Sequence, residues 1–87
     1  MGFTKKFYVL LDSLHKQVEF SKVAEQCMSD VTAENEDEGY TINAKSILGF
    51  YSLDLGKPVT ITVNDVEDAE RIEKALTKEN IRYSEGA

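Results

Sequence analysis

Few side chains in this 87-residue sequence are of a type that could carry out chemistry unaided. The sequence has one histidine, His15, and one cysteine, Cys27, both within one predicted helix. A metal site or a nucleophilic triad assembles several such side chains from separate segments, and neither glycine-rich phosphate-loop pattern occurs. The sequence therefore predicts no metal site, no cofactor and no self-contained enzyme, and Cys27 is expected to behave as a small buried hydrophobic residue.

The segment 43–53 contains the most suggestive polar residue, Ser46. It stands before a short apolar run that includes Ile47, Leu48 and Tyr51. A serine that begins a helix lies among backbone N–H groups without helical partners, at the positive end of the helix dipole. A helix this short cannot easily bury all its large apolar side chains. Two interpretations remain open, an ordinary capped core helix or an accessible serine beside an apolar contact surface.

Four strands and three helices are predicted around these residues. The alternation Val-Thr-Ile-Thr-Val at 59–63 and the apolar run at 7–11 indicate strands. Two shorter strands, 31–34 and 40–43, are joined by a solvated acidic loop. Helices are predicted at about 14–28, at 46–52 and after Asp65. The order β-α-β-β-α-β-α is typical of an α+β open-faced sandwich.

The alternation at 59–63 also predicts where the helices lie. Its valines and isoleucine share one face and its threonines the other, so all three helices are expected on the same face of the sheet. Asp12 or Ser13 is expected to cap the first helix and Asp65 the last. The predicted apolar helix faces are Leu14, Val18, Ser21, Cys27 and Met28 in the first helix, and Val66, Ala69, Ile72 and Leu76 in the last. Ile81 and Tyr83 are expected to dock on the core, with the chain frayed from Ser84 onward.

The net charge of the chain and the lengths of its apolar runs exclude several classes of function. Ten Lys and Arg against sixteen Asp and Glu give a net charge of −6, which argues against nucleic-acid binding and against adsorption to an anionic membrane. No apolar run approaches the roughly 18–20 residues of a membrane span, and the N-terminus lacks the apolar core of a signal peptide. The sequence predicts a single domain over residues 1–87, cytoplasmic, whose partners are proteins.

The segment 44–53 closely resembles the regulatory-serine region of HPr, the phosphocarrier family of the bacterial sugar phosphotransferase system. Weaker similarity covers residues 3–80 and includes Ser29-Asp30-Val31 and the strand at 59–63. The resemblance implies an antiparallel four-stranded sheet with three helices on one face. It also implies that HPr kinase phosphorylates Ser46, which would control carrier activity and catabolite repression. The implied partner surface is Ile47, Leu48 and Tyr51, and the implied partners are HPr kinase, phosphotransferase components or a catabolite regulator.

The carrier-histidine motif of the family is not intact in this sequence. Family members carry the phosphoryl group on the histidine of Gly-Ile-His-Ala-Arg-Pro-Ala, whereas residues 12–18 here read Asp-Ser-Leu-His-Lys-Gln-Val. Gln17 replaces the arginine and Val18 the proline if His15 is aligned with that histidine. An ungapped alignment from Ser29 places Ser13 at the carrier position instead, and we favour this register because it keeps Phe20 at an apolar position.

These features predict a degenerate HPr-like protein, a regulatory or binding module that retains Ser46. One alternative is a functional phosphocarrier that uses His15. Another is a structural adaptor in which Ser46 only caps a helix.

Overall fold

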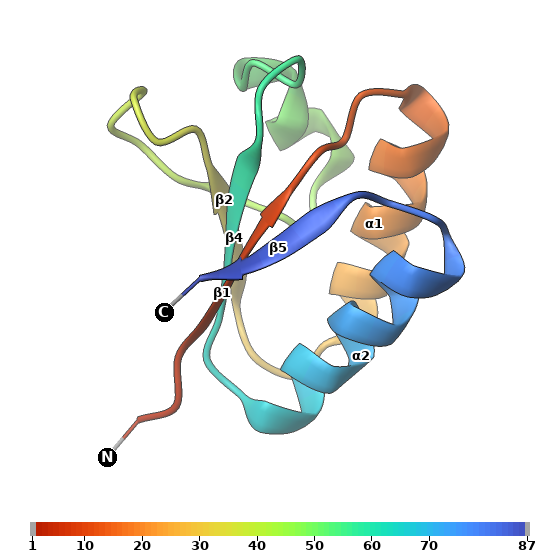
Figure 1. Ribbon diagram of the computed structural model, residues 1–87. Helices are drawn as coiled ribbons and strands as arrows, with labels where there is room; N and C mark the ends of the chain where they lie inside the picture. The colour runs from red at the N-terminus through yellow and green to blue at the C-terminus, as the bar shows by residue number, and fades with distance from the viewer. Residues whose placement is uncertain (1, 87) are drawn as a thin grey trace.

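A computed structural model describes residues 2–86 as one antiparallel sheet with helices packed on one side (Figure 1). The elements are β1 (Lys5–Val9), α1 (Leu14–Gln26), β2 (Val31–Glu34), β3 (Ile42–Asn43), η1 (Ile47–Ser52, a 3-10 helix), β4 (Val59–Val63), α2 (Val66–Lys78) and β5 (Tyr83–Gly86). The strand order is β3-β2-β4-β1-β5, and every neighbouring pair is antiparallel. The predicted α+β open-faced sandwich is confirmed.

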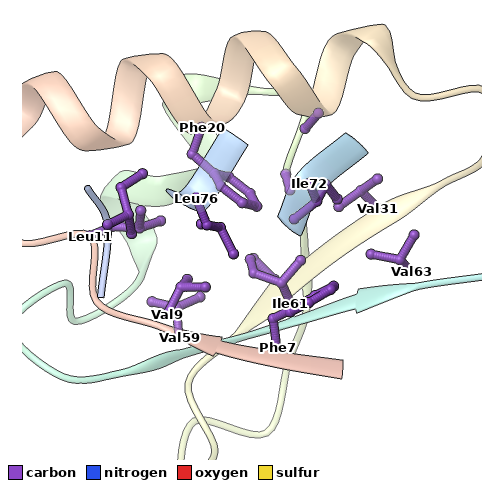
Figure 2. Packing of buried hydrophobic residues seen from close by; sticks show 14 of the residues in the cluster. Phe7, Val9, Leu11, Phe20, Val31, Val59, Ile61, Val63, Ile72 and Leu76 are labelled. Atoms are coloured by element: carbon purple, nitrogen blue, oxygen red, sulfur yellow. The ribbon is translucent and has the colours of Figure 1, made fainter. Parts of the chain in front are cut away.

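The core lies between the sheet and the helices. Val59, Ile61 and Val63 of β4 are fully buried, as their alternation predicted. On the opposite face Thr62 is half-buried, but Thr60 is buried, so this face is less open to solvent than the alternation predicted. Figure 2 shows Phe20 of α1 and Leu76 of α2 directed toward the strands from the helical layer. Phe50 of η1 is also fully buried in this cluster, so all three helices contribute to one core.

The predicted caps of the two long helices are present. The Lys16 N–H donates to Ser13 Oγ at 3.2 Å at the start of α1, and the Asp68 N–H donates to Asp65 Oδ2 at 3.0 Å at the start of α2. Such side-chain caps satisfy N–H groups that have no partner within the helix.

The apolar helix faces were predicted wrongly at three positions. Leu14, Met28 and Val66 are 61%, 88% and 51% exposed. Leu14 and Val66 are the first residues of their helices, and Met28 lies beyond the end of α1 at Gln26. These positions fall outside the helix segments that face the sheet, so the three-and-four spacing does not bury them.

The C-terminal part of the described chain differs most from the prediction. Residues 83–86 do not fray but form β5, which pairs with β1 and gives five strands rather than four. Asn80 adopts a left-handed conformation with φ of 57°, and the Ile81 N–H donates to the Leu76 carbonyl at 2.9 Å. This turn ends α2 and reverses the chain toward β1. Ile81 and Tyr83 dock on the core as predicted.

Candidate functional site

The Ser46 hydroxyl lies exposed at the start of η1 and makes no capping hydrogen bond. The Gly49 N–H donates to the Ser46 carbonyl at 3.0 Å. Asn43 supplies the local side-chain bond instead, because its Oδ1 accepts from the Lys45 N–H at 2.9 Å. The predicted capping by the Ser46 side chain is therefore wrong, and its hydroxyl is left open to solvent.

The apolar residues of η1 divide between core and surface. Phe50 is buried and meets the Phe20 ring edge to face, with centroids 6.3 Å apart. Leu48 and Tyr51 are 72% and 64% exposed, while Ile47 is partly buried against the core. Leu48 and Tyr51 therefore provide exposed apolar surface near Ser46, and Ile47 mainly anchors the helix.

Lys45 lies two residues before η1 and holds this part of the chain against α1. Its Nζ donates to the Cys27 carbonyl at 3.1 Å, just after the C-terminus of α1, where a cation is favoured. The Lys45 carbonyl in turn accepts from Ser21 Oγ at 3.3 Å. The Lys45 ammonium group is thus used to join two elements, although its residue precedes Ser46 directly.

Two residues of the loop between β2 and β3 tie it to the end of η1 and to Asp54 just beyond it, and sequence reasoning missed both. Asn35 is buried, its Nδ2 donates to the Asp54 carbonyl at 3.0 Å, and its Oδ1 accepts from the Asp54 N–H at 2.6 Å. The Tyr40 hydroxyl donates to the Ser52 carbonyl. The available signal was that Asn35 is the one uncharged residue in the run 34–38.

The carrier-site candidates lie at the N-terminus of α1. Ser13 caps the helix through its Oγ. The side chain of His15 is 72% exposed, and its Nε2 lies 3.5 Å from Glu79 Oε1. The structure therefore places a solvent-facing imidazole beside a carboxylate, which would repel an incoming phosphoryl group.

The side chains beside His15 are already bonded elsewhere. Lys16 Nζ donates to Asp12 Oδ1 at 2.9 Å, and this hydrogen bond is the main reason that the pKa of Asp12 is lowered. Gln17 Nε2 donates to the Leu11 carbonyl at 2.9 Å. Gln17, which would take the arginine position if His15 were the carrier residue, thus braces the β1–α1 connection and supplies no charged donor to His15.

Cys27 and the remaining acidic residues provide no reactive centre. Burial is the main reason that the pKa of the Cys27 thiol is raised to about 11, and the Asp68 carboxylate adds to this shift. The thiol is therefore protonated at neutral pH and is a poor nucleophile. Within residues 2–86, no group of three or more His, Cys, Asp or Glu side chains could hold a metal ion. In the same range, no helix is long and apolar enough to cross a membrane.

Comparison with known families gives one match that covers most of the chain. The family model described as the PTS HPr component phosphorylation site matches residues 17–79. No curated protein matches the chain. The matched stretch contains Ser46 and all of η1, whereas Ser13 and His15 lie before it.

Proposed function

Because this chain belongs to the HPr family of the phosphotransferase system, we propose that it is a regulatory or binding module controlled by phosphorylation of Ser46. Members of the family are phosphocarriers rather than catalysts, so the chain is acted on by other proteins. The observation that carries the proposal is the exposed Ser46 hydroxyl, which has no capping bond and directly precedes the helix that exposes Leu48 and Tyr51.

The proposed modification transfers the γ-phosphoryl group of ATP to Ser46 Oγ. The hydroxyl proton leaves, the new O–P bond forms, and ADP departs. The product gains roughly −1.5 to −2 charges and three acceptor oxygens. We infer that a partner which contacts Leu48 and Tyr51 distinguishes the two forms by this charge.

We expect the folded chain to accept the phosphate without unfolding. The net charge of −6 is spread over the surface, and salt screens charges beyond roughly 8–10 Å. Ser46 is exposed and its hydroxyl makes no capping bond, so modification breaks no cap. The Ser46→Asp variant is therefore expected to change the free energy of unfolding by no more than about 0.5 kcal/mol, as measured by thermal denaturation.

The direct test is incubation with HPr kinase and radiolabelled ATP. Stoichiometric labelling is expected for the natural chain and complete loss of label for Ser46→Ala. Ser52→Ala is the matched control, because Ser52 is also exposed, lies on η1, and donates its Oγ–H only to the Gly49 carbonyl at 2.8 Å. Absence of labelling in the natural chain, or equal labelling of Ser46→Ala, would contradict the proposal and leave a structural adaptor that is not phosphorylated.

A phosphocarrier that uses His15 is the second candidate, and the exposure of the imidazole favours it. Phosphohistidine formation also requires donors that stabilise the transferred charge. Here Lys16 is paired with Asp12, Gln17 is bonded to Leu11, and Glu79 lies near the imidazole. We therefore expect no rapid, stoichiometric phosphorylation of His15 by phosphoenolpyruvate and the general phosphotransferase enzyme.

Total label and its acid-labile fraction, both measured over time, check this expectation, with His15→Ala and Ser13→Ala as the two comparison variants. Rapid acid-labile label that disappears in His15→Ala alone would establish the carrier. Acid-stable label that disappears in Ser13→Ala alone would place the acceptor at Ser13, the position that the ungapped alignment favours.

We also infer that residues 1–87 act as one cytoplasmic domain with protein partners. The single core over residues 2–86 supports the domain assignment. The net charge of −6 favours protein partners over nucleic acid or an anionic membrane. The partners proposed are HPr kinase and either phosphotransferase components or a catabolite regulator.

A further inference from the structure

Strand β1 pairs with a different strand on each of its two sides, β4 and β5. On one side it pairs with β4 over five residue pairs, and on the other with β5 over four, from Lys6–Gly86 to Val9–Tyr83. Strand β4 lies within the stretch 17–79 that matches the family, while β5 follows it. Strand β5 thus covers an edge of the sheet that would otherwise offer its N–H and C=O groups to another strand.

Side chains at both ends of β5 complete this cover. The Tyr83 ring meets the Phe7 ring edge to face, with centroids 6.0 Å apart. Lys5 and Glu85 form an ion pair, and the Leu10 N–H donates to the Arg82 carbonyl at 3.0 Å. Tyr83 therefore shields the apolar side of β1, and Glu85 ties β5 to its polar end.

The attachment of β5 is nevertheless limited. Ser84 and Glu85 are exposed, and only Tyr83 reaches the core. Glu85 also lies beside Glu73 of α2, whose pKa it raises through a side-chain hydrogen bond first and charge repulsion second. The Lys5 ammonium group partly offsets this rise in the pKa of Glu73, so two carboxylates share one lysine at this end of β5. Because exposed ion pairs contribute only about 0–1 kcal/mol, β5 is held mainly by Tyr83 and the backbone ladder.

The sequence of β1 is suited to pairing with itself. In an antiparallel arrangement centred on Tyr8, Phe7 of one copy faces Val9 of the second copy, and Lys6 faces Leu10. The core-side residues Phe7 and Val9 then stay on one side of the joined sheet, as the two-residue period requires. No lysine faces a lysine, and the contact is the self-complementary kind that a two-fold dimer needs.

We propose that β5 is a cover for the β1 edge, and that the uncovered edge pairs with β1 of a second copy of this chain. While β5 is bound, the chain is a monomer. Displacement of β5 exposes one side of Phe7 along with the free backbone groups. The second copy restores both contacts at once, since it supplies an apolar strand and a full set of hydrogen-bonding groups.

The test compares the full chain with a variant that stops after Arg82, which removes Glu85 and changes the net charge from −6 to −5. Sedimentation velocity measures the oligomeric state, and circular dichroism confirms folding. We expect the shortened chain to dimerise with a dissociation constant at least about tenfold lower than that of the full chain. A folded shortened chain that stays monomeric at millimolar concentration would overturn the proposal.

Two substitutions in the shortened chain test the register. Tyr8→Lys places two lysines directly opposite each other at the two-fold axis, where like charges are destabilising, so this variant is expected to return to the monomer. Tyr8→Phe is the matched control and is expected to remain a dimer. Tyr8 is 39% exposed, so neither change disturbs the core. Equal dimerisation of the two variants would reject pairing through β1.

If the shortened chain fails to fold, the full chain still decides the question. Tyr83→Ala removes the ring that packs on Phe7, the main side-chain contact that holds β5, without removing any backbone. This variant is expected to form dimers, and Tyr83→Phe, which keeps the ring, is the matched control and is expected to stay a monomer. A folded Tyr83→Ala variant that stays monomeric at millimolar concentration would overturn the proposal.

Discussion

Replacement of Asp68 by alanine is expected to lower the free energy of unfolding by about 3–5 kcal/mol. Asp68 is fully buried at the start of α2, and its carboxylate accepts three hydrogen bonds. The donors are the Met28 N–H at 3.1 Å, the Ser29 N–H at 2.8 Å and Ser29 Oγ at 2.6 Å. A hydrogen bond to a charged group contributes roughly 1.5–3 kcal/mol, and the loss of three is not additive. Urea denaturation measures the change.

Asp68 also makes stability depend on pH. Burial opposes its ionisation, but the bonds from Ser29 and Met28 outweigh burial and lower the pKa below the ordinary value of 3.8. The stabilisation is therefore fully present above the pKa of the unfolded state and is lost as pH falls through the lower pKa of the folded state. The Asp68→Asn variant should be less stable at neutral pH and should lose less stability than the natural chain between about pH 5 and pH 2.

Asp30→Asn is the matched control for this prediction. Asp30 is exposed and adjoins Ser29 in sequence, so its replacement should change the free energy of unfolding by no more than about 0.5 kcal/mol. If the Asp68→Asn variant loses stability in acid as steeply as the natural chain, then other carboxylates cause the loss of stability between about pH 5 and pH 2. A loss below about 1 kcal/mol for Asp68→Ala would show that water replaces the missing acceptor.

The sequence could predict those parts of the fold that depend on local patterns. Strand β4 alternates strictly, and Ser13 and Asp65 directly precede the helices that they cap. Strand β5 could not be predicted in this way, since Tyr-Ser-Glu-Gly has no apolar alternation. Its pairing depends on the free edge of β1 and on the reversal at Asn80. Both are properties of the folded chain.

The candidate site, too, could be predicted from the sequence only in part. The apolar run after Ser46 correctly indicated a short helix, but the sequence could not tell that Asn43 would supply the local side-chain bond. Asp68 is one of two acidic residues in the first turn of α2, and no pattern in the sequence distinguishes it from the other. Its role depends on Met28 and Ser29, about 40 residues earlier in the chain. Long-range partners of this kind leave no periodic pattern in the sequence.

The Phe50→Ala substitution is expected to disturb the position of η1 while it leaves the rest of the fold in place. Phe50 is fully buried, and its ring packs edge to face on Phe20. Removal of a buried phenylalanine side chain costs roughly 3–5 kcal/mol, and a six-residue 3-10 helix has few hydrogen bonds of its own to keep it in place. Ser46, Leu48 and Tyr51 should therefore lose their fixed arrangement, although the sheet, α1 and α2 remain.

The measurement is the rate of the Ser46 labelling by HPr kinase that the proposed function predicts, taken below the melting temperature of each variant. We expect Phe50→Ala to slow labelling at least about tenfold, since small displacements of a reacting group have large effects on rate. Ile72→Ala is the control, because Ile72 is equally buried but lies on α2, and its loss costs a comparable 2–5 kcal/mol. If both variants are labelled at the same reduced rate, general instability explains the effect. If Phe50→Ala is labelled normally, the kinase recognises Ser46 without the fixed surface of η1.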